Sequence, residues 1–221
     1  MQQDESIDKI DTGIIVDEKI INGFIKCDGV KISDDEWKEN FNDWKYKLRL
    51  GNEVYLSSED IPIKLKKGEF VVIKPGDFAL LLTKEQIEVP LNVMAFISMR
   101  FDYKEKGLIN VSGFHVDPGY KGRLIFSAFN AGPNDIIIRE GDKVFMIFFQ
   151  KLPSKVGYRK EDGYTYIPTN MIAGIRGKSV TLASNANRME RLEFNFKILG
   201  GFVIAIMTAL LTLLIKELLK P

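Results

Sequence analysis

Short apolar runs, each followed by a turn, fill the middle of the chain. They lie in residues 61–97 and 123–150, and the turns between them contain Lys67-Gly68, Pro75-Gly76, Gly132-Pro133 and Gly141-Asp142. Apolar runs of strand length that alternate with glycine and proline turns favour an all-β sandwich or barrel. With 221 residues, the chain is long enough to bury one good core. The sequence therefore predicts a mainly β domain.

Helix is expected in only two places. Ser33 can cap a helix near residues 34–43, and a second helix is expected from about Asn187 onward. Residues 151–185, which are rich in glycine, are expected to be extended and looped. These patterns divide the chain into a β domain over residues 1–185, a juxtamembrane helix over 186–197 and a membrane anchor over 198–219.

The anchor is expected because residues 198–215 form a run of 18 residues without a charge, between Lys197 and Lys216. As a helix this run is roughly 27 Å long, close to a hydrocarbon core of about 30 Å, and Leu218 and Leu219 can extend it. Its eleven Leu, Ile, Phe and Val residues favour insertion by roughly 3 to 6 kcal/mol. The alternative is a buried or oligomer-forming helix of a soluble protein. Because basic residues precede the run, we expect a single-pass, C-terminally anchored protein with its β domain in the cytosol.

Composition excludes several classes of site. A net charge of +1, from 31 basic and 30 acidic residues, gives no field that would hold a nucleic acid polymer. The single cysteine, Cys27, and the single histidine, His115, exclude a disulfide and a zinc site of the Cys/His kind. The polar start of the chain predicts no signal peptide.

A turn over residues 113–123 carries most of the functional signal. Glycines and a proline surround His115, Asp117 and Tyr120 between two apolar runs. This composition predicts a tight turn that presents polar groups between strands, as a ligand site on a β scaffold does. Each of the three also has a structural alternative: Asp117 as a turn aspartate bonded to its own backbone, Tyr120 as a core residue and His115 as a structural histidine.

The turn belongs to an ordered set of motifs. Residues 114–122, 129–133 and 141–144 resemble the dCTP deaminase and dUTPase superfamily. Residues 46–53, 75–90 and 100–108 resemble three further motifs of that superfamily, and they occur in the same order. The resemblance covers about residues 10–150 and does not cover the C-terminal tail, since familiar members are soluble.

This resemblance implies a distorted β barrel that assembles as a homotrimer. It also implies sites at subunit interfaces that bind a pyrimidine deoxynucleoside triphosphate with Mg²⁺. Asp117 falls on the aspartate that, in dUTPases, activates the water that attacks the α-phosphate, a task for an ionised carboxylate. Tyr120 falls on the aromatic residue that packs against the deoxyribose.

The phosphate-binding motif departs from the family pattern. Arg100 is kept, but Phe101 and Asp102 replace two serines, and Glu105 replaces a second arginine. Because a carboxylate repels triphosphate oxygens, Lys104 or Lys106 would have to compensate. Lys178, in the loop over residues 176–179, is a candidate for a further phosphate contact, and the alternative there is a plain solvated turn.

Other departures concern the catalytic motifs. Ser127 stands where deaminase-type members place a glutamate that moves protons, so the base for deamination is missing. Lys47 replaces an aspartate of the first motif, and Met146 replaces a glutamine of the last. Ser127 is kept as a candidate substrate contact.

Three hypotheses follow. The one we favour is a membrane-anchored binding module for a pyrimidine deoxynucleoside triphosphate that has lost turnover. The second is an active enzyme of deoxynucleotide metabolism, for which dUTP diphosphatase chemistry is easier to defend than dCTP deamination. The third is a trimeric membrane scaffold that binds no nucleotide. The preference for uracil or cytosine cannot be read from the side chains.

Overall fold

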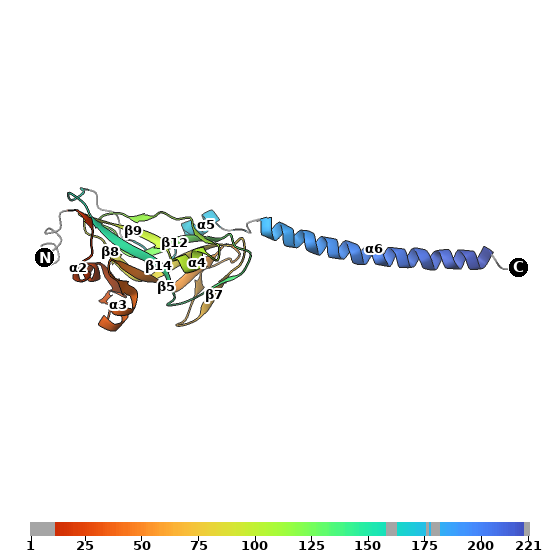
Figure 1. Ribbon diagram of the computed structural model, residues 1–221, viewed down its shortest axis with the longest axis horizontal. Helices are drawn as coiled ribbons and strands as arrows, with labels where there is room; N and C mark the ends of the chain where they lie inside the picture. Colours follow the sequence, from red (N-terminus) through yellow and green to blue (C-terminus); the bar gives the residue numbers. More distant parts are fainter. Residues whose placement is uncertain (1–11, 158–162, 176, 178–181, 219–221) are drawn as a thin grey trace. The chain divides into compact units, whose positions relative to one another are not determined.

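The computed structural model describes residues 12–157, 163–175, 177 and 182–218. The chain forms two compact units, Met1–Ser179 and Val180–Pro221, and each is described by itself. The first unit is built mainly from antiparallel strands (Figure 1). The prediction of a mainly β domain is confirmed.

The main sheet has the strand order β10-β12-β8-β5-β14-β9-β11. These strands are β5 (Lys45–Leu56), β8 (Phe78–Glu88), β9 (Val93–Met99), β10 (Leu108–Asn110), β11 (His115–Val116), β12 (Lys121–Asn130) and β14 (Lys143–Lys151). Short strands pair at its borders: β1 (Gly13–Ile14), β2 (Ile25–Cys27), β3 (Val30–Lys31), β4 (Phe41–Asn42) and β6 (Ile63–Lys64). A second sheet contains β7 (Phe70–Ile73) and β13 (Ile136–Arg139).

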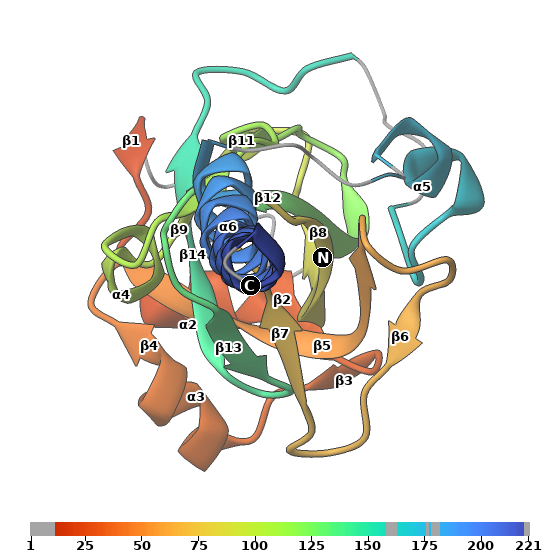
Figure 2. The same ribbon diagram turned by 90° about the vertical axis from the view of Figure 1, so that its right-hand side faces the viewer.

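The expected barrel is not closed by a strand ladder. The sheet ends at β10 and β11, and these two strands do not pair with each other in the described part of the chain. Figure 2 shows the strands of the sheet curling around one interior. Residues 111–114 cross the opening: Val111 donates its N–H to the Ser127 carbonyl on β12 (2.8 Å), and Ile97 on β9 donates to the Phe114 carbonyl (2.8 Å). We call this crossing the seam.

The core follows from strict alternation along the strands. In β9, Val93, Ala95, Ile97 and Met99 are buried, and the residues between them are partly exposed. Successive side chains of a strand point to opposite faces, so one face of the curled sheet fills the interior. Phe126 and Phe145 stack there with ring centroids 3.8 Å apart.

Two short helices precede β5. In α2 (Glu18–Phe24), Asp17 accepts hydrogen bonds from the backbone at the N-terminus. In α3 (Asp34–Asn40), Ser33 caps the N-terminus as predicted. The helix ends before the predicted Asp43 because Phe41 and Asn42 pair with β5 as β4.

The segment after β14 is less extended than expected. It contains α5 (Thr169–Ile175), a helix of seven residues. Ile167 and Ile172 are buried in a small apolar cluster with Tyr55, Leu80 and Leu82, on the outer face of β5 and β8. The expectation of a looped segment was wrong here because these isoleucines gain a hydrophobic partner. A four-residue helix, α4 (Phe101–Lys104), follows β9.

The second unit is one helix, α6 (Leu182–Leu218). It begins before the expected Asn187 and runs without a break through the segments predicted as juxtamembrane helix and anchor. By length and composition, Arg188–Lys216 can cross a membrane.

Candidate functional site

The turn over residues 113–123 is fixed by strands on both sides. β11 pairs with β9, and β12 begins at Lys121. Between them Gly119 donates to the Val89 carbonyl (2.9 Å), and Val89 donates to the Tyr120 carbonyl (2.9 Å). Gly119 has φ +81°, which side chains other than glycine rarely tolerate. The backbone of the turn is therefore held at its middle and at both ends.

His115 and Asp117 form a pair on this turn. His115 Nε2 lies 3.3 Å from Asp117 Oδ1, and the two side chains are 42% and 43% exposed. Their separation of two residues in extended backbone puts them on the same side of the chain. The structure thus brings two of the predicted site residues together at the surface, where a ligand can reach both.

Tyr120 takes a different position. Tyr120 is 3% exposed, and its hydroxyl donates to the Arg123 carbonyl. A Cβ added to Gly163 would lie 2.6 Å from the Tyr120 Cζ atom, so Gly163 covers the ring. Burial raises the pKa of Tyr120 well above its usual range. The structure places this ring in the core, and its contact with a sugar stays a prediction.

Arg100 and Lys104 lie at the two ends of α4. Arg100 Nη1 donates to the Lys143 carbonyl (3.0 Å), and Arg100 Nη2 is 2.5 Å from Asp102 Oδ2. Lys104 Nζ donates to Ser98 Oγ (2.8 Å). Asp102, which replaces a serine of the family motif, therefore pairs with Arg100 and offsets its positive charge within the same motif.

The strand register brings separate motifs side by side. Lys47 on β5 pairs with Met146 on β14, and Met146 pairs with Ser98 on β9. The two unusual residues of the first and last motifs are therefore neighbours, and Lys104 reaches the same row through Ser98. In the next row, Phe148 pairs with Phe96, which pairs with His115.

Ser127 lies on the other border of the seam. It is in β12 and accepts the hydrogen bond from Val111, whereas His115 is in β11 and pairs with β9. The Ser127 side chain is half-buried and faces away from Phe126 and Ala128, which are in the core. Lys178 lies outside the described residues.

No metal cage is visible in the residues that the structure describes. They contain no group of three or more His, Cys, Asp or Glu side chains that could hold a metal ion. Asp117 is a single carboxylate and does not form such a site by itself, so these residues do not fit a protein-held Mg²⁺ ion.

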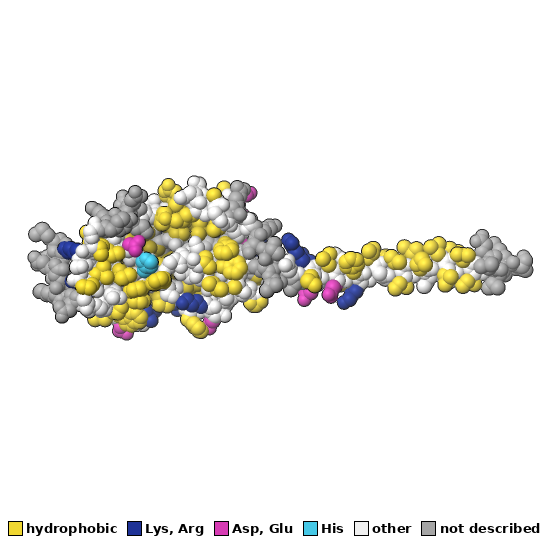
Figure 3. Space-filling view, turned by 90° about the horizontal axis from the view of Figure 1, so that it is seen from above, with side chains coloured by type: hydrophobic (Ala, Val, Ile, Leu, Met, Phe, Trp, Pro, Cys, Tyr) yellow, Lys and Arg dark blue, Asp and Glu magenta, His cyan; other side chains and the backbone are white. Residues whose placement is uncertain are grey.

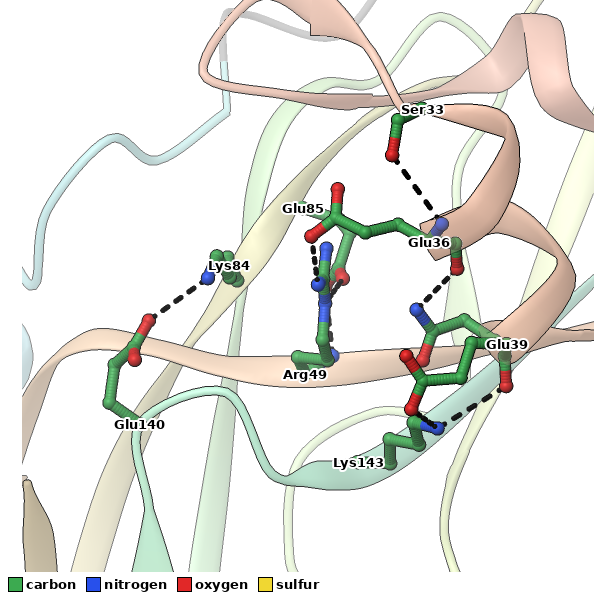
Figure 4. Close-up of polar contacts among 9 residues, drawn as sticks. Ser33, Glu36, Glu39, Arg49, Lys84, Glu85, Glu140 and Lys143 are labelled. Carbon is green, nitrogen blue, oxygen red and sulfur yellow. Dashed lines mark hydrogen bonds and ion pairs between the residues drawn. The ribbon is translucent and has the colours of Figure 1, made fainter. Parts of the chain in front are cut away.

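A buried ionic network was not predicted from the sequence. Arg49 Nε is 2.6 Å from Glu85 Oε1, and Arg49 Nη1 is 2.8 Å from Glu36 Oε1. Figure 4 shows Arg49 between Glu85 on β8 and Glu36 on α3. Burial raises the pKa of the Glu85 carboxyl, and the Arg49 guanidinium opposes this rise. The sequence feature that could have indicated the Arg49–Glu85 pair is that both charged residues occupy core positions of strands.

A partly exposed aromatic face was also missed. Phe96 stacks on Phe148 (5.3 Å between ring centroids) and on Phe114 (6.2 Å), and Trp44 meets Phe148 edge-on (5.2 Å). Phe114 is 66% exposed. Figure 3 shows hydrophobic side chains gathered on the face that carries the single histidine. The four rings come from four separate segments of the chain, so no local sequence pattern predicts that they lie together.

Comparison with known proteins decides the family. A family model described as dCTP deaminase-like matches residues 2–152. The chain belongs to the dCTP deaminase-like family. Among curated members, the dCTP deaminase of Pyrococcus abyssi is 34% identical over 116 residues, which are 52% of this chain and 73% of that protein. The dCTP deaminase of Thermococcus kodakarensis is 35% identical over the same length and covers the same shares of the two chains.

A solved structure agrees on the fold. The 2′-deoxycytidine 5′-triphosphate deaminase of Agrobacterium tumefaciens superposes with a TM-score of 0.52 at 16% identity. The match covers 64% of this chain and 49% of that one, so this member of the dCTP deaminase-like family spans about half the length of the solved protein. At this identity the likeness concerns the fold alone.

Proposed function

We propose that this dCTP deaminase-like protein binds a pyrimidine deoxynucleoside triphosphate and does not deaminate it. The observation that carries the proposal is the contrast across the seam. On one border, the His115–Asp117 pair is intact and accessible. On the other, β12 offers the hydroxyl of Ser127 where deaminase-type members place a glutamate.

The chemistry of the seam supports binding more than turnover. Water attack on a cytosine ring needs a group that accepts and returns a proton near neutral pH, as a carboxylate does. A serine hydroxyl does not do this without a base beside it. Binding requires only hydrogen-bonding groups and cations, which His115, Asp117 and Lys104 supply.

A trimer would complete the site. Two rings of the aromatic face defined above, Phe96 and Phe148, lie in the same row as His115, and the third, Phe114, directly precedes His115 and is largely exposed. Contiguous exposed apolar surface marks interaction sites, and a second copy that covers it removes apolar area from water. We propose that this face is covered by a second copy, so that each nucleotide site is built between subunits. The curled sheet would then act as the distorted barrel expected from the family.

Membrane anchoring is the third part of the proposal. α6 carries 18 consecutive uncharged residues from 198 to 215. Arg188, Arg191 and Lys197 precede this run, which favours a cytosolic location for the β domain. Nucleotide binding would then take place at the membrane surface.

Hydrolysis of dUTP is the second candidate function. It is favoured by Asp117, which is accessible and paired with His115, because a carboxylate in this position can orient a water molecule. Any Mg²⁺ would have to arrive bound to the triphosphate, since the described residues offer it no cage.

Calorimetric titration of the full chain in detergent tests the proposal. dCTP and dUTP are each titrated with Mg²⁺, and release of ammonia and pyrophosphate is measured in parallel. We expect saturable binding without ammonia release, and weaker binding by Asp117→Asn. Asp135→Asn, which changes an exposed aspartate outside the turn over residues 113–123, is the matched control and should bind normally.

The other hypotheses give different results. Pyrophosphate release that Asp117→Asn abolishes would establish the hydrolase. Ammonia release would overturn the role given to Ser127. If the chain is still trimeric but neither binds a nucleotide nor releases a product, only the scaffold hypothesis remains.

A further inference from the structure

A large open cavity lies on another side of the turn. Its volume is about 1110 Å³, and its walls come from α2, α3, the segment after β8 and residues Gly119, Tyr120 and Lys121. Neither His115 nor Asp117 lines it. Small-molecule sites in proteins commonly have volumes of about 300 to 1,000 Å³. The cavity is therefore large enough for an organic ligand of nucleotide size.

Basic side chains dominate its lining. Six lysines face three carboxylates, those of Glu18, Asp34 and Glu88. The lysines are Lys19, Lys26, Lys31, Lys38, Lys121 and Lys155. They come from separate segments of the chain, which is why no basic cluster stands out in a sequence whose net charge is +1.

The three carboxylates do not neutralise this charge. Glu88 Oε2 lies 2.7 Å from Lys26 Nζ and Glu88 Oε1 lies 3.4 Å from Lys121 Nζ, so this single carboxylate pairs with two lysines. The hydrogen bond from Lys26 lowers the pKa of Glu88, which keeps that carboxylate ionised. Glu18 is engaged by Trp37, whose Nε1 donates to it at 2.7 Å.

The remaining four lysines form no ion pair within the described part of the chain. Lys19, Lys31, Lys38 and Lys155 are exposed and have no ion-pair partner among the residues that the structure describes. Their ammonium groups can turn toward a ligand without first breaking a salt bridge. Lysine is a flexible point charge with three donors, suited to phosphate oxygens.

Part of the wall is apolar. Val89, Pro90 and Leu91 follow β8 and line the cavity beside the buried Trp37. A ligand could place a ring or chain against these residues while its phosphates meet the lysines. A concave site with charges on several sides fits a compact molecule better than a polymer.

We propose that this cavity binds a phosphate-bearing small molecule as a second site, separate from the His115–Asp117 pair. The site is connected to the turn through its backbone. Val89, which lines the cavity, exchanges hydrogen bonds with Gly119 and Tyr120, and Tyr120 donates its N–H to the Asp117 carbonyl (3.2 Å). A ligand that shifts Val89 therefore acts on the backbone that carries Asp117. The second site is a regulatory site for the turn, and its coupling to a ligand there is reciprocal.

Calorimetric titration of the full chain in detergent with inorganic triphosphate, without Mg²⁺, tests this site. The triple variant Lys31→Gln, Lys38→Gln, Lys155→Gln should bind at least about tenfold more weakly, since each change removes one charge-assisted hydrogen-bond donor for the phosphate oxygens. The matched control is Lys66→Gln with Lys67→Gln, two exposed lysines that do not line the cavity. A thermal melt checks that each variant folds.

The outcomes separate this site from the proposed nucleotide site. Triphosphate binding that survives Asp117→Asn and Arg100→Gln but fails in the triple variant supports the second site, whatever the fate of dCTP binding. Binding that fails in Arg100→Gln and persists in the triple variant would overturn it. Absence of saturable triphosphate binding, or binding of a single-stranded oligonucleotide alone, would overturn it as well.

Discussion

The Nε atom of Arg49 lies 2.6 Å from Oε1 of Glu85, and both side chains are withheld from water. The Arg49 backbone N–H also donates to Glu85 Oε2 (2.8 Å), so the carboxylate engages both the side chain and the strand. The pair lies beside the Leu50–Thr83 pair, where the register of β5 against β8 begins to shift. It fixes the bulged centre of the sheet, and through Glu36 it fixes α3 as well.

Replacing Arg49 with Met should be strongly destabilising. The change leaves the Glu85 carboxylate buried and unpaired, and breaking a buried pair in this way costs about 3 to 5 kcal/mol. Urea denaturation followed by circular dichroism measures the loss. The double variant Arg49→Met, Glu85→Leu should regain most of it, because neither position then holds an unpaired buried charge. A double variant no more stable than Arg49→Met would contradict this account.

The stability of the Arg49→Met variant should fall as the pH rises. Burial raises the pKa of Glu85, and without the Arg49 guanidinium only backbone hydrogen bonds from residues 49 and 85 still oppose that rise. A carboxyl whose folded-state pKa exceeds its unfolded value of about 4.3 stabilises the fold below that value, and this contribution is lost as pH rises through the folded pKa. Arg49→Met should therefore unfold at lower urea concentration at pH 8 than at pH 5. If the urea midpoint of the variant changes between pH 5 and pH 8 no more than that of the parent chain does, the buried Glu85 carboxyl is not the cause.

Local signals in the sequence were enough for the strands and for the cap of α3. Alternation and turn residues determine the strands, and Ser33 starts α3 by accepting a hydrogen bond from the Glu36 N–H. Contacts between distant segments could not be predicted in this way. Arg49 and Glu85 are 36 residues apart, α5 forms around Ile172 only because β5 and β8 offer an apolar surface, and Phe114 joins Phe96 and Phe148 only through the strand register.

Gly132 should tolerate no side chain. A Cβ at this position would lie 2.2 Å from the Lys106 carbonyl oxygen, and this neighbour is backbone that cannot rotate away. Gly132→Ala should lower the free energy of unfolding by about 2 kcal/mol or more, as overpacking does. Gly157→Ala is the control, because a Cβ there meets nothing within 4 Å. Similar thermal midpoints for the two variants would show that the 106–107 and 131–132 backbones can separate at little cost.

Removing an aromatic ring from the aromatic face should change the oligomeric state. Phe114 is 66% exposed, so Phe114→Ser should cost the subunit little, but it removes apolar area from the proposed contact. Light scattering of the detergent-solubilised chain should show a trimer for the parent and smaller species for the variant. Phe70→Ser, at an exposed ring on β7, is the control and should remain trimeric. A parent chain that is monomeric would remove the interface-built site from the proposed function.

A charge in the middle of α6 should release the protein from membranes. Ile206 lies near the centre of the uncharged run over residues 198–215, where an arginine costs about 2.5 to 3.5 kcal/mol and the lost isoleucine up to about 0.6 more. Because the whole run favours insertion by only roughly 3 to 6 kcal/mol on the same scale, Ile206→Arg removes most of the driving force. Alkaline extraction of cell membranes should leave the parent chain in the pellet and move the variant to the supernatant. Asn195→Arg, which places the same charge on the same helix before the run begins, should stay in the pellet. A parent chain that alkali extracts would show that α6 is covered by protein instead of lipid.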